Sequence, residues 1–275
     1  MYSLTLLSLL LTAAQPAWYS DYRDAYLEAK KQKKDLLIYF REQGQLDHVF
    51  DDADIKKKLS RFVCLKLPTD YVHKGERLLD HSAFEDMLGK PGLVIINLHD
   101  PESPFYKAII SAHPLVRSRY RWVPDYGKRE IGIILDLPSH LSLTQRSMIY
   151  ALRVHPENPK SVFGEPHAAF MDHCAWHCDR QASMMNQHHA DLIGASRRIG
   201  LRLRRQLRNA SEVVAESWGK VVGGENVLEA AFSCVDAWRH SPSHWGAVSS
   251  YHRYFGYDLS RARNGTWYAT GIFAD

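Results

Sequence analysis

The stretch His-Cys-Ala-Trp-His-Cys at residues 173–178 carries the side chains best suited to binding a metal in this sequence. On a helix, Cys174 and Cys178 share one face and His173 and His177 share the adjacent face, because residues four apart lie one turn from each other. Zinc sites usually take ligands from a second segment, and here Cys234 is the one further cysteine on a predicted helix. A disulfide from Cys234 to Cys174 or Cys178 would suit an exported protein. We favour a set of buried reduced thiols, then the disulfide, then zinc.

The composition predicts a two-domain globular chain. Of its 275 residues, 45% are apolar and 24% are charged, and domains are typically about 100–150 residues long. The net charge of +4 is too small to indicate a polyanion binder. Four cysteines are too few for a fold that depends on disulfides.

The first residues indicate export. An apolar run from Leu4 to Leu11 is followed by Thr12 and Ala14 in the small-x-small arrangement of a cleavage site, so we expect a signal peptide at 1–17. The run is shorter than the roughly 20 residues that span a bilayer, and no later stretch is long enough. We therefore expect a periplasmic, cell-surface or extracellular protein without a transmembrane segment.

Helices and strands alternate over the next hundred residues. The continuous apolar run Leu36–Phe40 is typical of a central strand that is covered on both faces. The expected elements are helices at Asp21–Lys33, Asp52–Leu59 and Ser82–Leu88, and strands at Leu36–Phe40, Phe62–Leu67, Leu93–Leu98 and Tyr106–Ile110.

This order of elements resembles secreted variants of the thioredoxin-like fold. The resemblance rests on the stretch Asp21–Ala25 and on the lysine-rich stretch Ala29–Lys34, which runs directly into the Leu36–Phe40 strand. It implies a thioredoxin-like βα sandwich over residues 18–115.

The residues that would carry redox chemistry in that family are absent. Family members have a Cys-x-x-Cys motif just after this strand, where Arg41–His48 contains no cysteine. Thiol–disulfide exchange requires an attacking thiolate, so we expect no oxidoreductase activity. Cys64 lies inside a predicted strand and is expected to be buried and structural. The family usually has a cis proline at the position of Pro91, and the sequence leaves cis and trans open there.

Residues 116–141 read as a linker with a connecting strand. Basic and aromatic residues interleave at 116–130, a composition that binds single-stranded nucleic acid in some proteins. A connector whose aromatic residues pack on a neighbouring domain is commoner, so no nucleic-acid partner is expected. Glu130–Leu137 reads as a strand and Thr144–Val154 as a helix, and the sequence does not decide which domain owns these two elements.

The last third of the chain is similar to the bacterial branch of the CAP superfamily, the SCP-like relatives of cysteine-rich secretory and pathogenesis-related proteins. That branch has a long first helix with a histidine near its end, then a Gly-Glu-Asn-Ile-Ala segment, a helix ending in Trp-x-x-Ser-Pro-Gly-His, and a terminal Trp-Tyr strand. The matching stretches here are the predicted helix His167–Asp191, Ser211–Trp218, the predicted helix Val227–Trp238 with Arg239–Trp245, and Asn264–Phe273.

The resemblance implies an α-β-α sandwich over 142–275, with its core at 166–275, so the chain as a whole would combine α/β and α+β units. It also implies a cleft lined by histidines and acidic residues. Glu212 matches the acidic position, His244 matches the motif histidine, and His188 or His189 matches the first histidine. Three residues depart from the family pattern: Ser211 and Ser243 stand where the family has glycine, and Val213 stands where it has asparagine.

Two functions fit these candidates. The first is an exported, non-catalytic binding protein whose CAP-like cleft takes a small apolar ligand or a lipid or other cell-envelope component. The alternative is a hydrolase or peptidase that uses Glu212, His244 and His188 or His189, with or without zinc, because imidazole is a good zinc ligand and a general base. No cofactor is required by the first function. The arginine-rich stretch Arg197–Arg208 could dock on anionic lipid head groups or cell-wall polymers, but we favour a solvated flank with a few aliphatic anchors.

Overall fold

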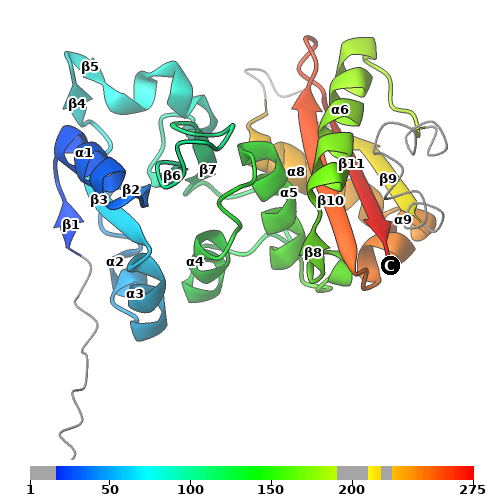
Figure 1. Cartoon of the computed structure of the whole chain (residues 1–275), viewed down its shortest axis with the longest axis horizontal. Helices are drawn as coiled ribbons and strands as arrows, with labels where there is room; N and C mark the ends of the chain where they lie inside the picture. The colour runs from blue at the N-terminus through cyan, green and yellow to red at the C-terminus, as the bar shows by residue number, and fades with distance from the viewer. Residues whose placement is uncertain (1–16, 191–209, 218–224) are drawn as a thin grey trace, which may run out of the picture.

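The computed structural model describes residues 17–190, 210–217 and 225–275. All but the last residue of the predicted signal peptide, and the whole arginine-rich stretch Arg197–Arg208, lie outside the described residues. Helices and strands are mixed along the chain, as expected for a combination of α/β and α+β units (Figure 1). None of the helices in the described ranges has the length and apolarity that crossing a bilayer requires.

The N-terminal unit is built on a five-stranded mixed sheet with the order β1-β3-β2-β6-β7. The first three strands in that order are parallel, whereas β6 and β7 are antiparallel to their neighbours. These strands are β1 (Trp18–Tyr19), β2 (Asp35–Arg41), β3 (Phe62–Pro68), β6 (Gly92–Ile96) and β7 (Ile109–Pro114). The last of them begins at Ile109 rather than at the predicted Tyr106.

The central strand β2 is buried on both faces, which confirms the prediction from its apolar run. Leu37 and Tyr39 point into one apolar cluster, whereas Leu36, Ile38 and Phe40 point into another on the opposite face. Such alternation follows from the two-residue period of a strand. A continuous apolar run therefore serves two cores at once.

Helices and one small hairpin surround this sheet. Asp21 and Asp52 cap the first and third helices, since each carboxylate accepts a hydrogen bond from a backbone N–H of the first turn. The Lys90–Pro91 peptide bond is trans. The surrounding elements are α1 (Tyr22–Gln32), α2 (Asp47–Phe50), α3 (Ala53–Leu59), β4 (Val72–His73), β5 (Glu76–Arg77) and the 3₁₀ turns η1 (Leu78–Asp80) and η2 (Ser82–Met87).

The connecting segment contains a helix where a strand was predicted. Helix α4 (Lys128–Leu135) buries Ile131, Ile134 and Leu135, which recur at helical spacing. The Gly127 N–H donates to a Glu130 carboxylate oxygen at 3.1 Å and so closes the first turn. The prediction of a strand at Glu130–Leu137 was wrong, because isoleucine has a high strand propensity but these buried residues recur at helical spacing.

The aromatic residues of the connector pack on the C-terminal unit. Trp122 lies 4.6 Å from the ring of His155 and 5.5 Å from that of Phe232, and its indole N–H donates to Asp236 at 3.1 Å. Tyr120 also packs against this core. The interleaved aromatic residues thus have a packing role.

The C-terminal unit has three layers around a four-stranded sheet with the order β8-β10-β11-β9. Helix α6 covers one face, and α5 and α8 cover the other (Figure 1). Its elements are α5 (Leu143–Val154), η3 (Lys160–Val162), β8 (Glu165–Pro166), α6 (Ala168–Met184), β9 (Ser211–Glu216), α8 (Val227–Arg239), α9 (Pro242–Ser249), β10 (Tyr254–Arg261) and β11 (Trp267–Ala274). A Cβ added to Gly256 would lie 2.5 Å from a Phe170 backbone atom, so a glycine lets α6 lie directly on β10.

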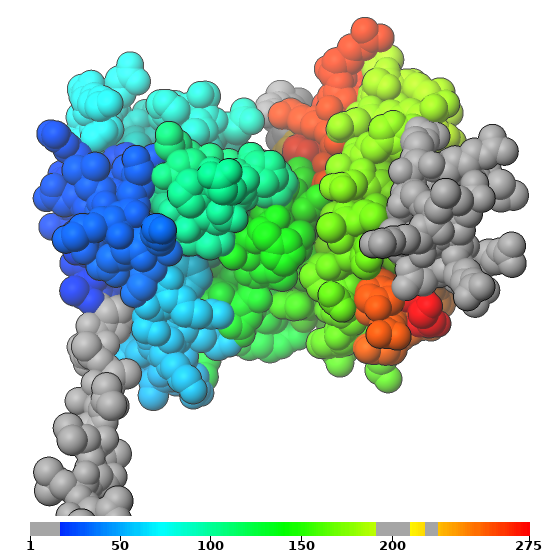
Figure 2. Space-filling model, viewed as in Figure 1, coloured from blue at the N-terminus to red at the C-terminus, as the bar shows by residue number. Residues whose placement is uncertain are grey.

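The two units share one core. Helix α5 packs on β7 of the first sheet and on β10 of the second, and a single apolar cluster extends from Leu37 to Phe273. Asp86 of the N-terminal unit caps α8, because its carboxylate accepts the Val227 N–H at 2.8 Å. Figure 2 shows the connecting helices, in green, filling the space between the blue N-terminal residues and the C-terminal unit.

Candidate functional site

Helix α6 presents a polar row to the C-terminal sheet. His173, His177 and Gln181 follow one another at intervals of four residues, and all three are buried. The helix ends at Met184, where Met185 adopts a left-handed conformation with φ 51°. The predicted end at Asp191 was therefore wrong, and His188 and His189 lie in the segment after the helix.

Strand β9 places Glu212 opposite this row. Val213 and Ala215 belong to the shared apolar core on the other side of the sheet. Because side chains alternate along a strand, Glu212 points to the α6 face. Its neighbour on β11 is Ile272, and Thr270 follows on the same face.

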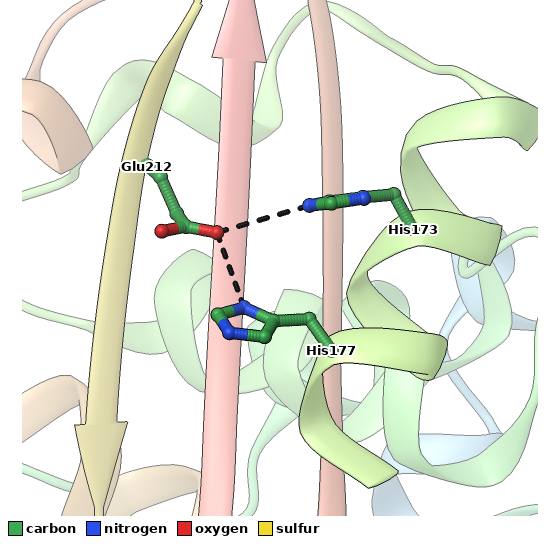
Figure 3. A group of neighbouring side chains, drawn as sticks. All are labelled: His173, His177 and Glu212. Carbon is green, nitrogen blue, oxygen red and sulfur yellow. Dashed lines mark ion pairs between the residues drawn. The ribbon is translucent and has the colours of Figure 1, made fainter. Parts of the chain in front are cut away.

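One oxygen of Glu212 lies between two buried histidines (Figure 3). Glu212 Oε1 is 3.1 Å from His177 Nδ1 and 3.8 Å from His173 Nε2. One potential ligand atom from each residue lies within 4.8 Å of the other two, so this group could hold a metal ion. We call His173, His177 and Glu212 the inner cluster. Its side chains are at most 2% exposed.

The inner cluster contains buried polar atoms without hydrogen-bond partners. They are His173 Nε2, His177 Nε2 and Glu212 Oε1. The 3.8 Å contact is too long for a hydrogen bond, and Oε1 and His177 Nδ1 are close without being aligned as one. Each such orphan costs about 1–3 kcal/mol, and native proteins contain few of them.

The other oxygen of Glu212 faces the sequence-predicted histidines. Glu212 Oε2 accepts the Ala190 N–H at 2.8 Å and lies 3.1 Å from His189 Nδ1. The His189 ring, which is half exposed, is 5.6 Å from the ring of His244 on α9. We call His189, His244 and this oxygen the outer group. His188 instead lies beside the inner cluster, with its ring 5.1 Å from that of His177.

Opposing effects act on the charge of this site. Burial by itself raises the pKa of Glu212, but the imidazoles of His173 and His177 and the Ala190 N–H bring it down to about 2. Burial lowers the pKa of His244, and the neighbouring His189 lowers it further. Glu212 is therefore a carboxylate at neutral pH.

The cysteines of α6 belong to a different environment from its histidines. Cys174, Cys178, Cys234 and Cys64 are all buried and free, so the disulfide considered for Cys234 is not formed. Burial raises the pKa of each thiol, that of Cys64 to about 12. The Cys178 thiol donates to the Asp258 carbonyl at 3.1 Å.

The sequence did not reveal that Glu212 contacts the two histidines of α6, His173 and His177. The shared face of His173 and His177 was visible in the sequence, and Glu212 was selected separately. The alternation of β9, with Val213 and Ala215 as its apolar side, could have indicated that Glu212 faces a helix. A comparison of the chain with known protein families, curated proteins and solved structures found no match.

Proposed function

We propose that the chain joins a redox-inactive thioredoxin-like unit to a CAP-like unit. The mixed sheet with both faces buried supports the first assignment, and the three layers around β8-β10-β11-β9 support the second. The trans bond before Pro91 departs from the thioredoxin-like pattern. The stretch Arg41–His48 has no thiol, so this unit would serve as a scaffold whose Asp86 caps α8 of its neighbour.

The function that we infer is exported, non-catalytic binding of a small apolar ligand or a cell-envelope component at the outer group. The observation that carries it is the contact between Glu212 Oε2 and the half-exposed His189, beside His244. Two imidazoles and a carboxylate at a surface can hold the polar end of a ligand by charge-assisted hydrogen bonds. Of the three histidines considered for zinc, His189 and His244 lie in the outer group, whereas His188 lies beside His177, so the proposal assigns no zinc ion to the three together.

Binding can be tested by co-sedimentation of the purified chain with anionic phosphatidylglycerol vesicles and, separately, with cell-wall sacculi. His189→Ala and His244→Ala should weaken sedimentation with one of these materials by about tenfold, the equivalent of one lost charged contact. His240→Ala is the matched control, because His240 is an exposed histidine at the end of α8. Equal sedimentation of all variants, or none by the wild type, would contradict this function.

A metal-assisted or metal-free hydrolase is the second candidate. It is favoured by the geometry of His189, whose Nδ1 faces the Glu212 carboxylate and leaves Nε2 as a base. A carboxylate that orients an imidazole in this way is a recurring part of hydrolytic sites. A peptide library assayed with and without chelator separates the candidates. Turnover that His189→Ala abolishes and His240→Ala preserves would replace the binding function by the hydrolase.

A further inference from the structure

We propose that the inner cluster, His173, His177 and Glu212, binds one divalent transition-metal ion, most suitably zinc, between α6 and β9. This site goes beyond the proposed function, which concerns the outer group, and does not depend on it. The two share Glu212 but use different oxygens of its carboxylate.

The donor set is one that zinc uses in proteins. Two histidines four residues apart on a helix can bind the same ion, because their side chains lie on one face. Glu212 adds a carboxylate oxygen from a separate strand. Two imidazoles and one carboxylate form a three-ligand set that leaves the fourth position open. Nitrogen and oxygen donors favour zinc and its neighbours in the first transition row over Mg²⁺ or Ca²⁺.

The distances lie close to those a bound ion requires. Ligands at roughly 2.0–2.1 Å from a tetrahedral zinc are about 3.3 Å from one another. In the structure Glu212 Oε1 is 3.1 Å from His177 and 3.8 Å from His173, and no pair of ligand atoms exceeds 4.8 Å. Small side-chain rotations would bring the three atoms to one ion. The ring of His188 lies 5.1 Å from that of His177 but is not one of the three ligands, so the fourth position stays open.

One of the three ligands, Glu212, is held by partners outside the cluster. The Ala190 N–H and His189 fix Glu212 Oε2, so Oε1 stays directed at the histidines. Outer partners of this kind orient metal ligands and set their tautomers. Thr270 Oγ1 accepts a hydrogen bond from Gln181 at 3.0 Å and lies 3.3 Å from His177 Nδ1, the nitrogen that also faces Glu212, so an ion bound through Nδ1 would replace this Thr270 contact.

The competing interpretation is a buried polar network without a metal. Such a network would be expected to pair its members, as buried polar groups normally do. Here His173 Nε2 and Glu212 Oε1 are buried without a hydrogen-bond partner, and one ion between them would satisfy both atoms at once. The third such atom, His177 Nε2, is not the nitrogen that faces Glu212. A buried water is the remaining way to satisfy them, and metal analysis distinguishes it from an ion.

The test uses the full chain freed of metal by chelator and then titrated with zinc chloride. Calorimetry and elemental analysis should give one tightly bound zinc per chain. His173→Gln and His177→Gln should each weaken zinc binding by at least about 100-fold, because loss of an outer partner alone already costs 10–100-fold. The control His240→Gln should keep the wild-type affinity within about threefold, since His240 is exposed at the end of α8 and belongs to neither the inner cluster nor the outer group.

X-ray absorption of the zinc-loaded wild type gives a second readout that does not depend on whether the variants fold. We expect a first shell of nitrogen and oxygen only. A sulfur shell would move the site to the cysteines of α6 and overturn the proposal. Absence of stoichiometric zinc in the wild type, or unchanged affinity in folded His173→Gln, would also overturn it. The proposed function of the outer group can fail while the zinc site holds. In that case the wild type would bind zinc normally, and His244→Ala would not change sedimentation.

Discussion

A buried carboxyl in the C-terminal core should make stability depend on pH. Asp258 on β10 is 4% exposed and accepts hydrogen bonds from Gln145 Nε2 at 3.0 Å and from the Leu259 N–H at 2.8 Å. Burial raises its pKa from 3.8 to about 6, although those hydrogen bonds and Thr144 oppose the shift. At neutral pH the folded protein therefore carries an ionised group in an apolar core.

The sign and size of the effect follow from that shift. The folded state holds the proton more tightly than the unfolded state, so the contribution of Asp258 is fully favourable below about pH 4 and is lost as pH rises through about 6. Each pKa unit corresponds to about 1.36 kcal/mol, which makes the total change roughly 3 kcal/mol. Asp258→Asn cannot ionise and should lack this change. It should also lose about 1 kcal/mol at every pH, because its amide cannot accept both hydrogen bonds.

Urea unfolding in chelator at pH 4, 5, 6 and 7.5 measures the prediction. Asp258→Asn should be less stable than the wild type by about 1 kcal/mol at pH 4 and more stable by about 2 kcal/mol at pH 7.5. Asp172→Asn is the matched control, because Asp172 is an exposed aspartate on α6. Its unfolding free energy should run parallel to that of the wild type.

The difference between variant and wild type is the decisive quantity. Carboxylates with lowered pKa, such as Asp47 and Glu157, act in the opposite direction but are common to both proteins and cancel. A constant difference between Asp258→Asn and the wild type across this pH range would refute the reasoning. It would mean that water or a neighbouring cation stabilises the Asp258 charge in solution.

Three further outcomes are expected from the same structure. Zinc at 100 times its dissociation constant for the wild type should stabilise the wild type by about 2.7 kcal/mol in thermal denaturation and His173→Gln by at most about 0.4 kcal/mol. Equal shifts would contradict the inner site. Arg146→Ala should lower the free energy of unfolding in urea by at least about 3 kcal/mol, because the buried guanidinium donates to the carbonyls of Leu137 and Pro138 and no protein group would replace it. A loss under about 1 kcal/mol would show that water replaces the guanidinium as the donor. Gly256→Ala should cost about 1–3 kcal/mol by pushing α6 away from β10, whereas the exposed Gly246→Ala should be neutral or stabilising.

The regular elements of the N-terminal unit could be predicted because local signals agreed with one another. The apolar run of β2, the caps Asp21 and Asp52, and the helical spacing in α1 all point to the structure that forms. The failure at α4 has the opposite cause. Isoleucine-rich residues at 131–134 favour a strand by propensity, but their burial against α3 and α5 selects the helix. Tertiary packing of this kind is not encoded in a short window.

The candidate site was predictable in its residues but not in its connections. Glu212 is separated from His177 by 35 positions, and only the pairing of β9 with β11 brings its carboxylate under α6. The same carboxylate contacts buried histidines through one oxygen and an exposed histidine through the other. An ion bound to Glu212 Oε1 in the inner cluster would hold the whole carboxylate in place, including Oε2, which orients His189 at the surface. Loss of zinc should loosen the outer group even though no outer residue binds it, whereas loss of His244 should leave the ion in place.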